Sequence, residues 1–272
     1  EKRSRNLTDE LLALPYVNGE LFRERLEFAA FDGDMREALI ECCEFNWSRI
    51  SPAVFGSLFQ SIMAGEEGKK KRRQIGAHYT SERDIMKVVR SLFLDDLKAE
   101  LAACGTNKKK LQDFQNKLAA LKFLDPACGC GNFLVVTYRE LRELELRVLQ
   151  RLHGGQIDSA RLLLESLLRV DVDQMHGIEI EEWPARIAEV AMWLIDHQMN
   201  QKVGEAFGQP VRRLPLVKSA KIAHANALRL DWNEVLPAAE CSFVLGNPPF
   251  VGHHLQTDEQ KSDQNRVWSP VP

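Results

Sequence analysis

The feature that most constrains the fold of this chain is a glycine-rich turn between a short apolar segment and a long helical one. The apolar segment Leu121–Leu124 predicts a strand, the turn spans Asp125–Asn132, and apolar spacing then predicts a helix over Phe133–Arg151. Glycines at 129 and 131 let the backbone bend sharply and approach a ligand closely. A strand, a tight turn and a helix in this order are typical of the ligand crevice of an open α/β sheet.

Three further segments predict the rest of that sheet. They are Val172–Ile180, Lys221–Ala225 and Cys241–Leu245, with helices expected at about 157–169 and from Pro184 onward. Strands that alternate with helices indicate parallel strands joined by right-handed crossovers. We therefore predict an α/β fold with a Rossmann-like sheet of four strands.

The turn favours one kind of cofactor over others. No Gly-Lys-Ser/Thr follows it, so it is not a Walker phosphate loop, and Phe133-Leu134 stands where a dinucleotide fingerprint needs a third glycine. S-adenosylmethionine has no pyrophosphate, so a turn that holds it need accommodate only an amino-acid moiety and a ribose. A tight connection that binds no ligand is the alternative for the turn taken alone.

Polar side chains at two later strand ends are candidates for cofactor contacts. Glu179 ends the second strand, where a carboxylate can accept hydrogen bonds from ribose hydroxyls, and Glu181 and Glu182 are more solvated competitors. Asn226 follows the third strand, where its amide could pair with an adenine edge or serve as an ordinary turn residue. Asp231 is the competing candidate for that contact.

The segment Gly246–Phe250, with the sequence Gly-Asn-Pro-Pro-Phe, follows the fourth predicted strand. Its tandem prolines fix φ and remove two N–H donors, which leaves the Pro248 carbonyl and the Asn247 side-chain oxygen to accept from one NH₂ group. Two acceptors expose the lone pair of the amino nitrogen, and positioning and electrostatics then favour methyl transfer. Phe250 offers an aromatic face to a base flipped from a duplex. With the glycine turn, this segment indicates methylation of an amino nitrogen by S-adenosylmethionine, with adenine N6 in DNA favoured.

The chain before the sheet divides into a helical part and a polar lead-in. Residues 1–75 are expected to form a helical connector, with Met35 and Leu39 at helical spacing, and residues 76–272 to form the catalytic part. Ser81 and Asp84 predict a capping box, so the segment Gly76–Thr80 lies at a helix N-terminus that favours a carboxylate. The lysine-rich stretch Lys98–Lys117 is interpreted as a surface excursion plus a helix.

Composition sets the class of protein. The net charge of −3 is not the basic balance of a complete nucleic-acid-binding protein, so any positive surface is local or lies on parts outside this chain. Six cysteines without a disulfide spacing indicate reduced thiols and a cytoplasmic protein, and Cys128 with Cys130 lacks the second pair of a zinc site, so no metal is expected. No apolar run is long enough to span a membrane. The first residue is Glu1 rather than Met, so we expect a piece of a longer protein.

These motifs, in this order, resemble the gamma class of amino-group DNA methyltransferases. The combination of Phe55–Phe59 (Phe-Gly-Ser-Leu-Phe) with Asn247–Gly252 (Asn-Pro-Pro-Phe-Val-Gly) is similar to the fused type II restriction–modification enzymes of the MmeI kind. The resemblance covers about residues 50–265. It implies a class I sheet that is incomplete at its C-terminal side. It also implies double-stranded DNA as partner, with a downstream target-recognition domain and an upstream nuclease that lie outside this chain.

The resemblance also implies roles for particular residues. The methionine moiety of the cofactor is lined by His78, Tyr79 and Thr80. The cofactor turn is formed by Asp125, Ala127, Cys128, Gly129 and Gly131, and the ribose and adenine wall by Glu179 and Ile180. The target base is held by Asn247, Pro248, Pro249 and Phe250. The chain departs from the family at Cys130, where serine is usual, and at Asn226, where many relatives have aspartate.

Several alternatives remain open at this point. Asn-Pro-Pro with an aromatic residue also serves methyltransferases of protein glutamine or of RNA, although a methionine-site motif upstream of the turn favours DNA. Cytosine N4 is a less favoured target, because Asn rather than Ser stands at 247. A non-catalytic, cofactor-binding scaffold is the alternative from another class. With only four strands, we expect the chain to be inactive alone. The last residues, 255–272, are expected to be mobile.

Overall fold

The computed structural model describes residues 30, 32–45, 50–51, 54, 80–154, 164–211 and 220–268. They fall into two compact units, Glu1–Asn46 and Trp47–Pro272. In the first unit, helix α2 spans Gly33–Glu44 and begins at Asp32, whose carboxylate accepts a hydrogen bond from the Met35 amide at 2.8 Å. This helix lies where a helix was predicted, whereas Phe55–Phe59 and the rest of the predicted connector lie outside the residues described.

The second unit contains the predicted parallel sheet. Its strands are β1 (Phe123–Asp125), β2 (Met175–Glu179), β3 (Lys221–His224) and β4 (Phe243–Val244). They pair in parallel in the order β3-β2-β1-β4, with Leu124 opposite both His176 and Val244. The strands are shorter than predicted, because residues 172–174 form a 3₁₀ turn ahead of β2 and β4 keeps only two paired residues. The prediction of a four-stranded α/β sheet is confirmed.

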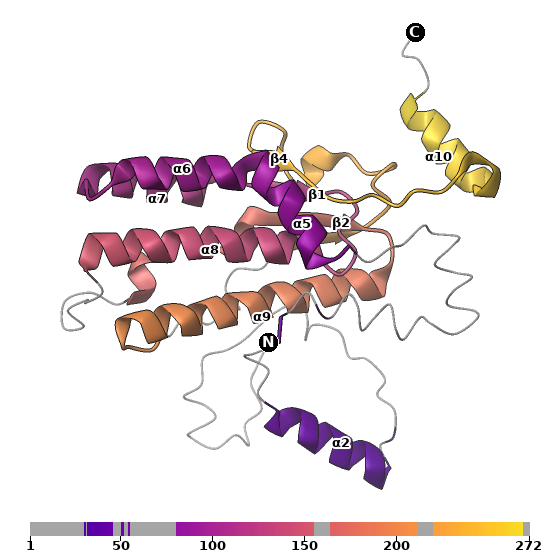
Figure 1. The fold of residues 1–272 in the computed structure, drawn as a ribbon. Coiled ribbons are helices and arrows are strands. Elements are labelled where there is room, and N and C mark those ends of the chain that lie inside the picture. Colours follow the sequence, from indigo (N-terminus) through magenta and orange to yellow (C-terminus); the bar gives the residue numbers. More distant parts are fainter. Residues whose placement is uncertain are drawn as a thin grey trace, which may run out of the picture. The chain divides into compact units, whose positions relative to one another are not determined.

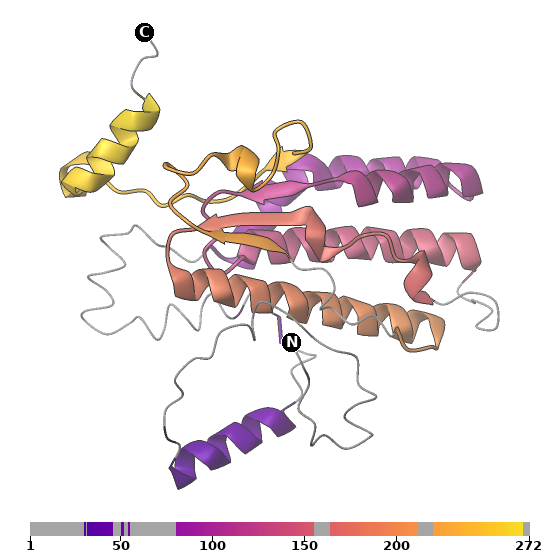
Figure 2. The same ribbon diagram turned by 180° about the vertical axis from the view of Figure 1, so that it is seen from behind.

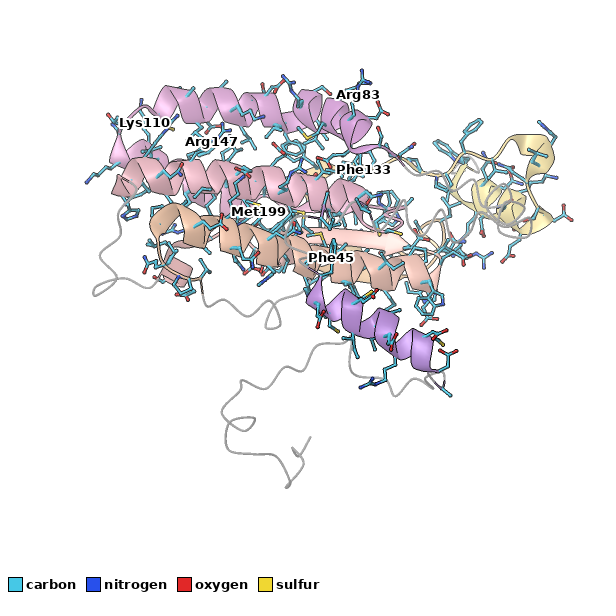
Figure 3. The ribbon with its side chains drawn as sticks, turned by 60° about the horizontal axis from the view of Figure 1, so that its bottom comes forward. Phe45, Arg83, Lys110, Phe133, Arg147 and Met199 are labelled. Atoms are coloured by element: carbon cyan, nitrogen blue, oxygen red, sulfur yellow. The ribbon has the colours of Figure 1, made fainter. Side chains whose placement is uncertain are left out.

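Helices cover one face of this sheet, as the two opposite views in Figures 1 and 2 show. Helices α8 and α9 run side by side along it (Figure 3). The helical elements are α5 (Glu82–Val89), a π-helical segment (Arg90–Leu94), α6 (Asp95–Cys104), α7 (Lys108–Ala120), α8 (Asn132–His153) and α9 (Glu182–Phe207). The helix predicted for about 157–169 is described only over Leu164–Leu167, which is a short 3₁₀ turn.

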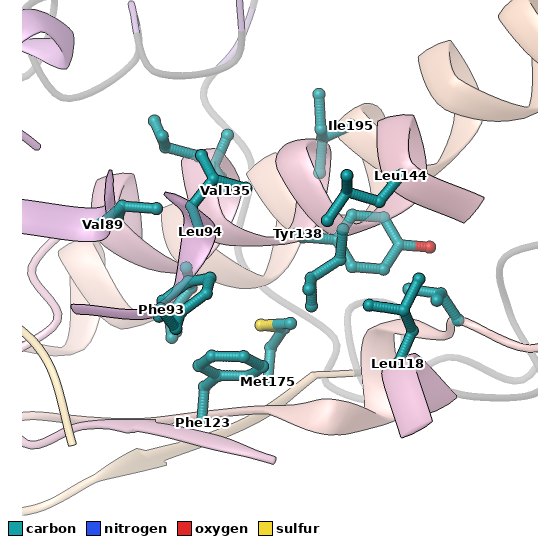
Figure 4. Close-up of a cluster of buried hydrophobic side chains, with 14 of the residues drawn as sticks. Val89, Phe93, Leu94, Leu118, Phe123, Val135, Tyr138, Leu144, Met175 and Ile195 are labelled. Atoms are coloured by element: carbon teal, nitrogen blue, oxygen red, sulfur yellow. The ribbon is translucent and has the colours of Figure 1, made fainter. Parts of the chain in front are cut away.

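Side chains alternate between the two faces of the strands. Phe123 of β1 belongs to the large core beneath the helices, where Phe93 packs above it with ring centroids 5.1 Å apart (Figure 4). Phe243 of β4 completes this aromatic group at 5.0 Å from Phe93 and 5.6 Å from Phe123. On the other face, Leu124 packs with Ile178 in a smaller cluster. The aromatic group therefore joins the helical segment Arg90–Leu94 to β1 and to the edge strand β4.

The stretch Lys98–Lys117 contains the predicted helix, but the part predicted as a surface excursion is helical and packed as well, so that part of the prediction was wrong. Helices α6 and α7 form a hairpin that turns at Gly105, where φ is 54°. One face of the hairpin is buried, with Leu101, Leu111 and Phe114 all at or below 2% exposure. The lysines occupy the opposite faces and masked this apolar spacing in the sequence.

A buried polar network fixes α8 against α9. The Arg142 guanidinium donates to Asp196 Oδ1 at 2.8 Å and to Asn200 Oδ1 at 2.8 Å, and the Tyr138 hydroxyl donates to Asp196 Oδ1 at 2.6 Å. Burying these charges is tolerated because each meets a partner of opposite charge or a hydrogen-bonding group. The network keeps α9 where it can contact the glycine turn.

Candidate cofactor and substrate site

The predicted glycine turn joins β1 to α8. Gly129 and Gly131 have φ of 55° and 80°, a region that side chains disfavour, and Gly131 directly precedes the first residue of α8. A Cβ on Gly131 would lie 3.0 Å from the Cβ of Ala188 on α9. The second glycine therefore serves both the turn and the close approach of α9.

Glu179, at the end of β2, reaches into this turn. Its Oε2 accepts from the Gly129 amide at 2.8 Å and its Oε1 accepts from the Glu181 amide at 2.9 Å. Burial raises the pKa of Glu179, although the two amides oppose this effect. The carboxylate is thus fixed beside the backbone of the turn and retains lone pairs for further donors. This is the position in which a carboxylate can bind ribose hydroxyls, although that contact stays a prediction.

Asp125 lies between the glycine turn and the Asn-Pro-Pro-Phe segment. Its side chain is 1% exposed, and its Oδ1 accepts from the Ala127 amide at 3.1 Å. A Cβ on Gly246, whose φ is 154°, would lie 2.4 Å from the same oxygen. Burial, helped by the negative charge of Glu179, raises the pKa of Asp125 to about 7. The requirement for glycine at position 246 was not recognised from the sequence, because Asp125 and Gly246 meet only through the pairing of β1 with β4.

The Asn-Pro-Pro-Phe segment leaves the sheet beside β1. The Leu245 amide donates to the Leu124 carbonyl at 2.9 Å, which extends the β1–β4 pairing by one residue. Asn247 then donates from Nδ2 to Thr80 Oγ1 at 3.0 Å. Among the residues described, no donor meets the Asn247 side-chain oxygen, and Phe250 is 86% exposed. The segment therefore presents an amide oxygen and an aromatic ring at the carboxyl edge of the sheet.

Thr80 immediately precedes helix α5. The Ser81 hydroxyl accepts from the Asp84 amide at 3.2 Å, which confirms Ser81 as the N-cap of the predicted capping box. The Asp84 carboxylate accepts from the Ser81 hydroxyl at 2.7 Å instead of from the Ser81 backbone amide that a full capping box uses. His78 and Tyr79 lie outside the part of the chain described. Of the three residues predicted at the methionine site, Thr80 is therefore the one that can be placed, and it lies next to Asn247.

The loop after β3 is held close to β2. The Ala225 amide donates to the Glu179 carbonyl at 2.8 Å, so Asn226 follows at the same edge of the sheet. The Asn226 amide, however, is engaged within the protein: Nδ2 donates to Asp263 Oδ2 at 2.9 Å and Oδ1 accepts from the Leu228 amide at 2.9 Å. Its competitor Asp231 accepts from the Asn233 amide at 2.9 Å and so begins a 3₁₀ turn.

Asp263 belongs to a helix that was not predicted. Residues Asp258–Trp268 form α10 in the stretch that was expected to be mobile. The sequence carried little signal for this helix, because its mean composition is polar and its contacts are made with a distant loop. After β2, Ile180 is 54% exposed and Trp183 is 73% exposed, and the role of Ile180 as a wall of the cofactor site stays a prediction.

The two cysteines of the turn are packing residues. Cys128 and Cys130 are both buried, and burial raises the pKa of Cys130 to about 12. A Cβ on Gly177 of β2 would lie 2.8 Å from Cys128 Sγ, so this thiol fills the space above the strand. Within the described ranges, no three metal-ligating side chains are gathered in one place, and no helix is long and apolar enough to cross a membrane.

These features define a class of protein. A parallel sheet with a glycine turn after β1, a carboxylate at the end of β2 and a proline-rich segment after β4 is a Rossmann-like α/β domain. In such folds, ligands bind at the carboxyl ends of the strands. The model of a family described as the MmeI DNA-methyltransferase domain matches residues 101–271, more than half of the chain. The chain belongs to this family, which confirms the resemblance found in the sequence.

Individual relatives agree with this assignment. The chain is 40% identical over 267 residues to DNA methyltransferase A of Bacillus subtilis (strain 168), across 96% of this chain and 29% of the relative. A putative type II restriction enzyme and methyltransferase of Methanocaldococcus jannaschii is 24% identical over 66% of this chain and 18% of its own length. The solved structure of the type IIL restriction–modification enzyme MmeI in complex with DNA is 54% identical, with a TM-score of 0.87. It matches 99% of this chain, which spans 35% of that protein.

Proposed function

We propose that this chain carries the cofactor site and the target-base site of a DNA methyltransferase within a restriction–modification enzyme. The reaction is transfer of a methyl group from S-adenosylmethionine to the exocyclic N6 of an adenine flipped out of double-stranded DNA. The observation that carries this proposal is the contact between Asp125 of the glycine turn and Gly246 of the Asn-Pro-Pro-Phe segment. It brings the glycine turn next to the Asn-Pro-Pro-Phe segment, which supports a cofactor site beside a site for an amino group.

The residues at this edge suit S-adenosylmethionine. Gly129 and Gly131 expose backbone without side chains at two positions of the turn, and Glu179 beside it can accept from two ribose hydroxyls. Ile180 offers an exposed apolar surface to the adenine of the cofactor, and Thr80 lies within hydrogen-bonding distance of Asn247. The cofactor supplies an electrophilic methyl group on a sulfonium sulfur.

The target amino group is held by two acceptors. The Asn247 side-chain oxygen and the Pro248 carbonyl accept its two N–H bonds and expose the nitrogen lone pair for in-line attack. The hydrogen bond from Asn247 Nδ2 to Thr80 Oγ1 supports this role, because it commits the NH₂ end of the amide to Thr80 and leaves the oxygen for the substrate. Phe250, 86% exposed, stacks on the flipped base. No strong base is required, since the proton leaves after methylation.

The wider organisation is also a proposal. We infer that residues 1–75 are a helical connector and that residues 76–272 are the N-terminal part of the catalytic domain, in a cytoplasmic enzyme. The chain spans 29% and 35% of the lengths of two relatives, which leaves room in a longer protein for a target-recognition domain and a nuclease. The 272-residue chain is then expected to be inactive alone.

The experiment uses the full-length protein that contains this chain, with S-adenosylmethionine labelled in its methyl group. Label is expected in duplex DNA and not in RNA or protein, and Asn247→Ala should reduce its incorporation at least about 100-fold. Calorimetry should show binding of S-adenosylmethionine but not NAD, weakened by Glu179→Ala and retained by Asn247→Ala. Label in RNA or protein alone would replace the DNA substrate. Cofactor binding without transfer to any substrate would favour a scaffold.

A further inference from the structure

We propose that Asp263 of α10 is a positioning residue for the target-base segment, which it holds by latching α10 to the loop after β3. The inference rests on the proposed function only for its catalytic consequence. We call the contact of Asp263 with Asn226 and Arg229 the α10 latch. It gives a role to a helix whose sequence carries no recognised motif.

The latch anchors α10 to the loop after β3. The helix is polar and its described residues are exposed or half-buried apart from Asp263, which is 7% exposed. Both carboxylate oxygens of Asp263 are used: Oδ1 accepts from Arg229 Nε at 2.7 Å and Oδ2 from Asn226 Nδ2 at 2.9 Å. These two donors hold the pKa of Asp263 below its usual value, with Arg229 as the main cause. A charge-assisted pair with both oxygens satisfied is stronger than an ordinary surface ion pair.

A second contact of the same arginine serves as an internal comparison. Arg229 also donates from a terminal nitrogen to Glu259 Oε1 at 2.7 Å, one turn earlier on α10. The Glu259 side chain is 72% exposed, against 10% for Asp263. Arg229 is 44% exposed in both pairs, so the two contacts differ in their carboxylates. Solvent screens Glu259 more than Asp263, so the Asp263 contact should contribute more of the anchoring.

The latch bears on catalysis through the path of the chain. The target-base segment Asn247–Phe250 lies between β4, which ends at Val244, and α10, which begins at Asp258. At its start the chain is fixed by the Leu245 amide on β1 and by the hydrogen bond of Asn247 to Thr80. Between Asn247 and α10 the hydrogen bonds described are local, such as Leu255 to Gly252 at 2.7 Å. The latch is therefore the anchor at the far end of this segment. Releasing it should let the segment fluctuate and lose the alignment that methyl transfer needs.

The latch also fixes a side chain near the cofactor. Asn226 donates to Asp263 and accepts from the Leu228 amide, so its orientation depends on α10. The loop it belongs to is bonded to the Glu179 carbonyl through Ala225. Loss of the latch should therefore disturb the position of the target-base segment more than that of Glu179.

The test compares Asp263→Ala with the matched control Glu259→Gln in the full-length protein. Hydrogen exchange of residues 247–257 should accelerate about tenfold or more in Asp263→Ala, while α8 exchanges as in the wild type and Glu259→Gln changes exchange less than twofold. The kcat for methylation should fall about tenfold in Asp263→Ala with the Kd for S-adenosylmethionine within about threefold. Arg229→Met, which cuts the latch from the loop side, should reproduce both effects.

The outcomes separate the latch from the proposed function. Unchanged exchange at 247–257 in both Asp263→Ala and Arg229→Met would overturn the latch, as would equal effects of Asp263→Ala and Glu259→Gln. A general acceleration that includes α8 would show a merely structural role and would likewise overturn it. If the wild-type protein methylates no DNA, the proposed function fails, yet faster exchange confined to 247–257 would still support the latch.

Discussion

Because Asp125 is buried, we expect the free energy of unfolding to depend on pH in a specific way. The side chain is 1% exposed and receives one backbone hydrogen bond, and its pKa rises from an ordinary 3.8 to about 7 in the folded chain. Between these two values the folded chain keeps a proton that the unfolded chain has lost. Raising the pH therefore favours unfolding across this window, and the stabilising contribution of the protonated group is complete only below about pH 4.

The size of the effect follows from the same two values. At about 1.4 kcal/mol for each pH unit, a pKa that rises from 3.8 to about 7 costs on the order of 4 kcal/mol once the group is ionised. Asp125→Asn removes this titration, because the amide is neutral at every pH. The variant should therefore gain stability relative to the wild type, by up to that amount, as the pH is raised from 4 to 8.

The assay is urea unfolding of the chain and its variant at intervals between pH 4 and pH 8, followed by circular dichroism. The contributions of other titrating groups cancel when the free energies of unfolding of the two proteins are subtracted at each pH. The control is Asp231→Asn: hydrogen bonds from Asn233 lower the pKa of the exposed Asp231, so its smaller contribution is lost as the pH falls. A difference between Asp125→Asn and wild type that stays flat within about 0.5 kcal/mol would refute the argument.

Three further substitutions test other contacts. Gly246→Ala should destabilise the chain by about 2–3 kcal/mol in urea unfolding, because the added Cβ would lie 2.4 Å from Asp125 and φ at this position is 154°. The control Gly33→Ala should not destabilise the chain, because a Cβ at position 33 meets no other atom within 4 Å. Thr80→Val should lower the kcat for methylation about tenfold with Thr80→Ser near wild type, since the hydroxyl orients Asn247. An unchanged kcat in Thr80→Val would contradict this role. Phe93→Ala should cost about 3–5 kcal/mol in the same unfolding assay, and a loss below about 1 kcal/mol would contradict its place between β1 and β4.

The sheet and its turn were predictable because their signals are local. Glycines at 129 and 131, the apolar strands and the acidic end of β2 are each encoded within a few residues. The α6–α7 hairpin was not recognised, because lysines on its exposed faces hid the spacing of Leu101 and Leu111. Composition over a window reports the exposed face of a helix as strongly as the buried one.

The contacts that hold the candidate site together were harder to predict from the sequence. Asp125 and Gly246 meet because β4 pairs with β1, and that strand order cannot be deduced from either motif alone. Asn226 was recognised as a polar residue at a strand end, but its partner Asp263 lies on a helix whose anchoring is entirely tertiary. Sequence reasoning therefore found the residues of the candidate site more readily than the contacts that hold them.

The central claim is tested most directly by identifying the methylated atom. Duplex DNA incubated with S-adenosylmethionine and the full-length protein would be digested to nucleosides and analysed by mass spectrometry, with Asn247→Ala as control. We predict N6-methyldeoxyadenosine with the wild type and about 100-fold less with the variant. N4-methyldeoxycytidine as the product, or equal methylation by the variant, would contradict the account.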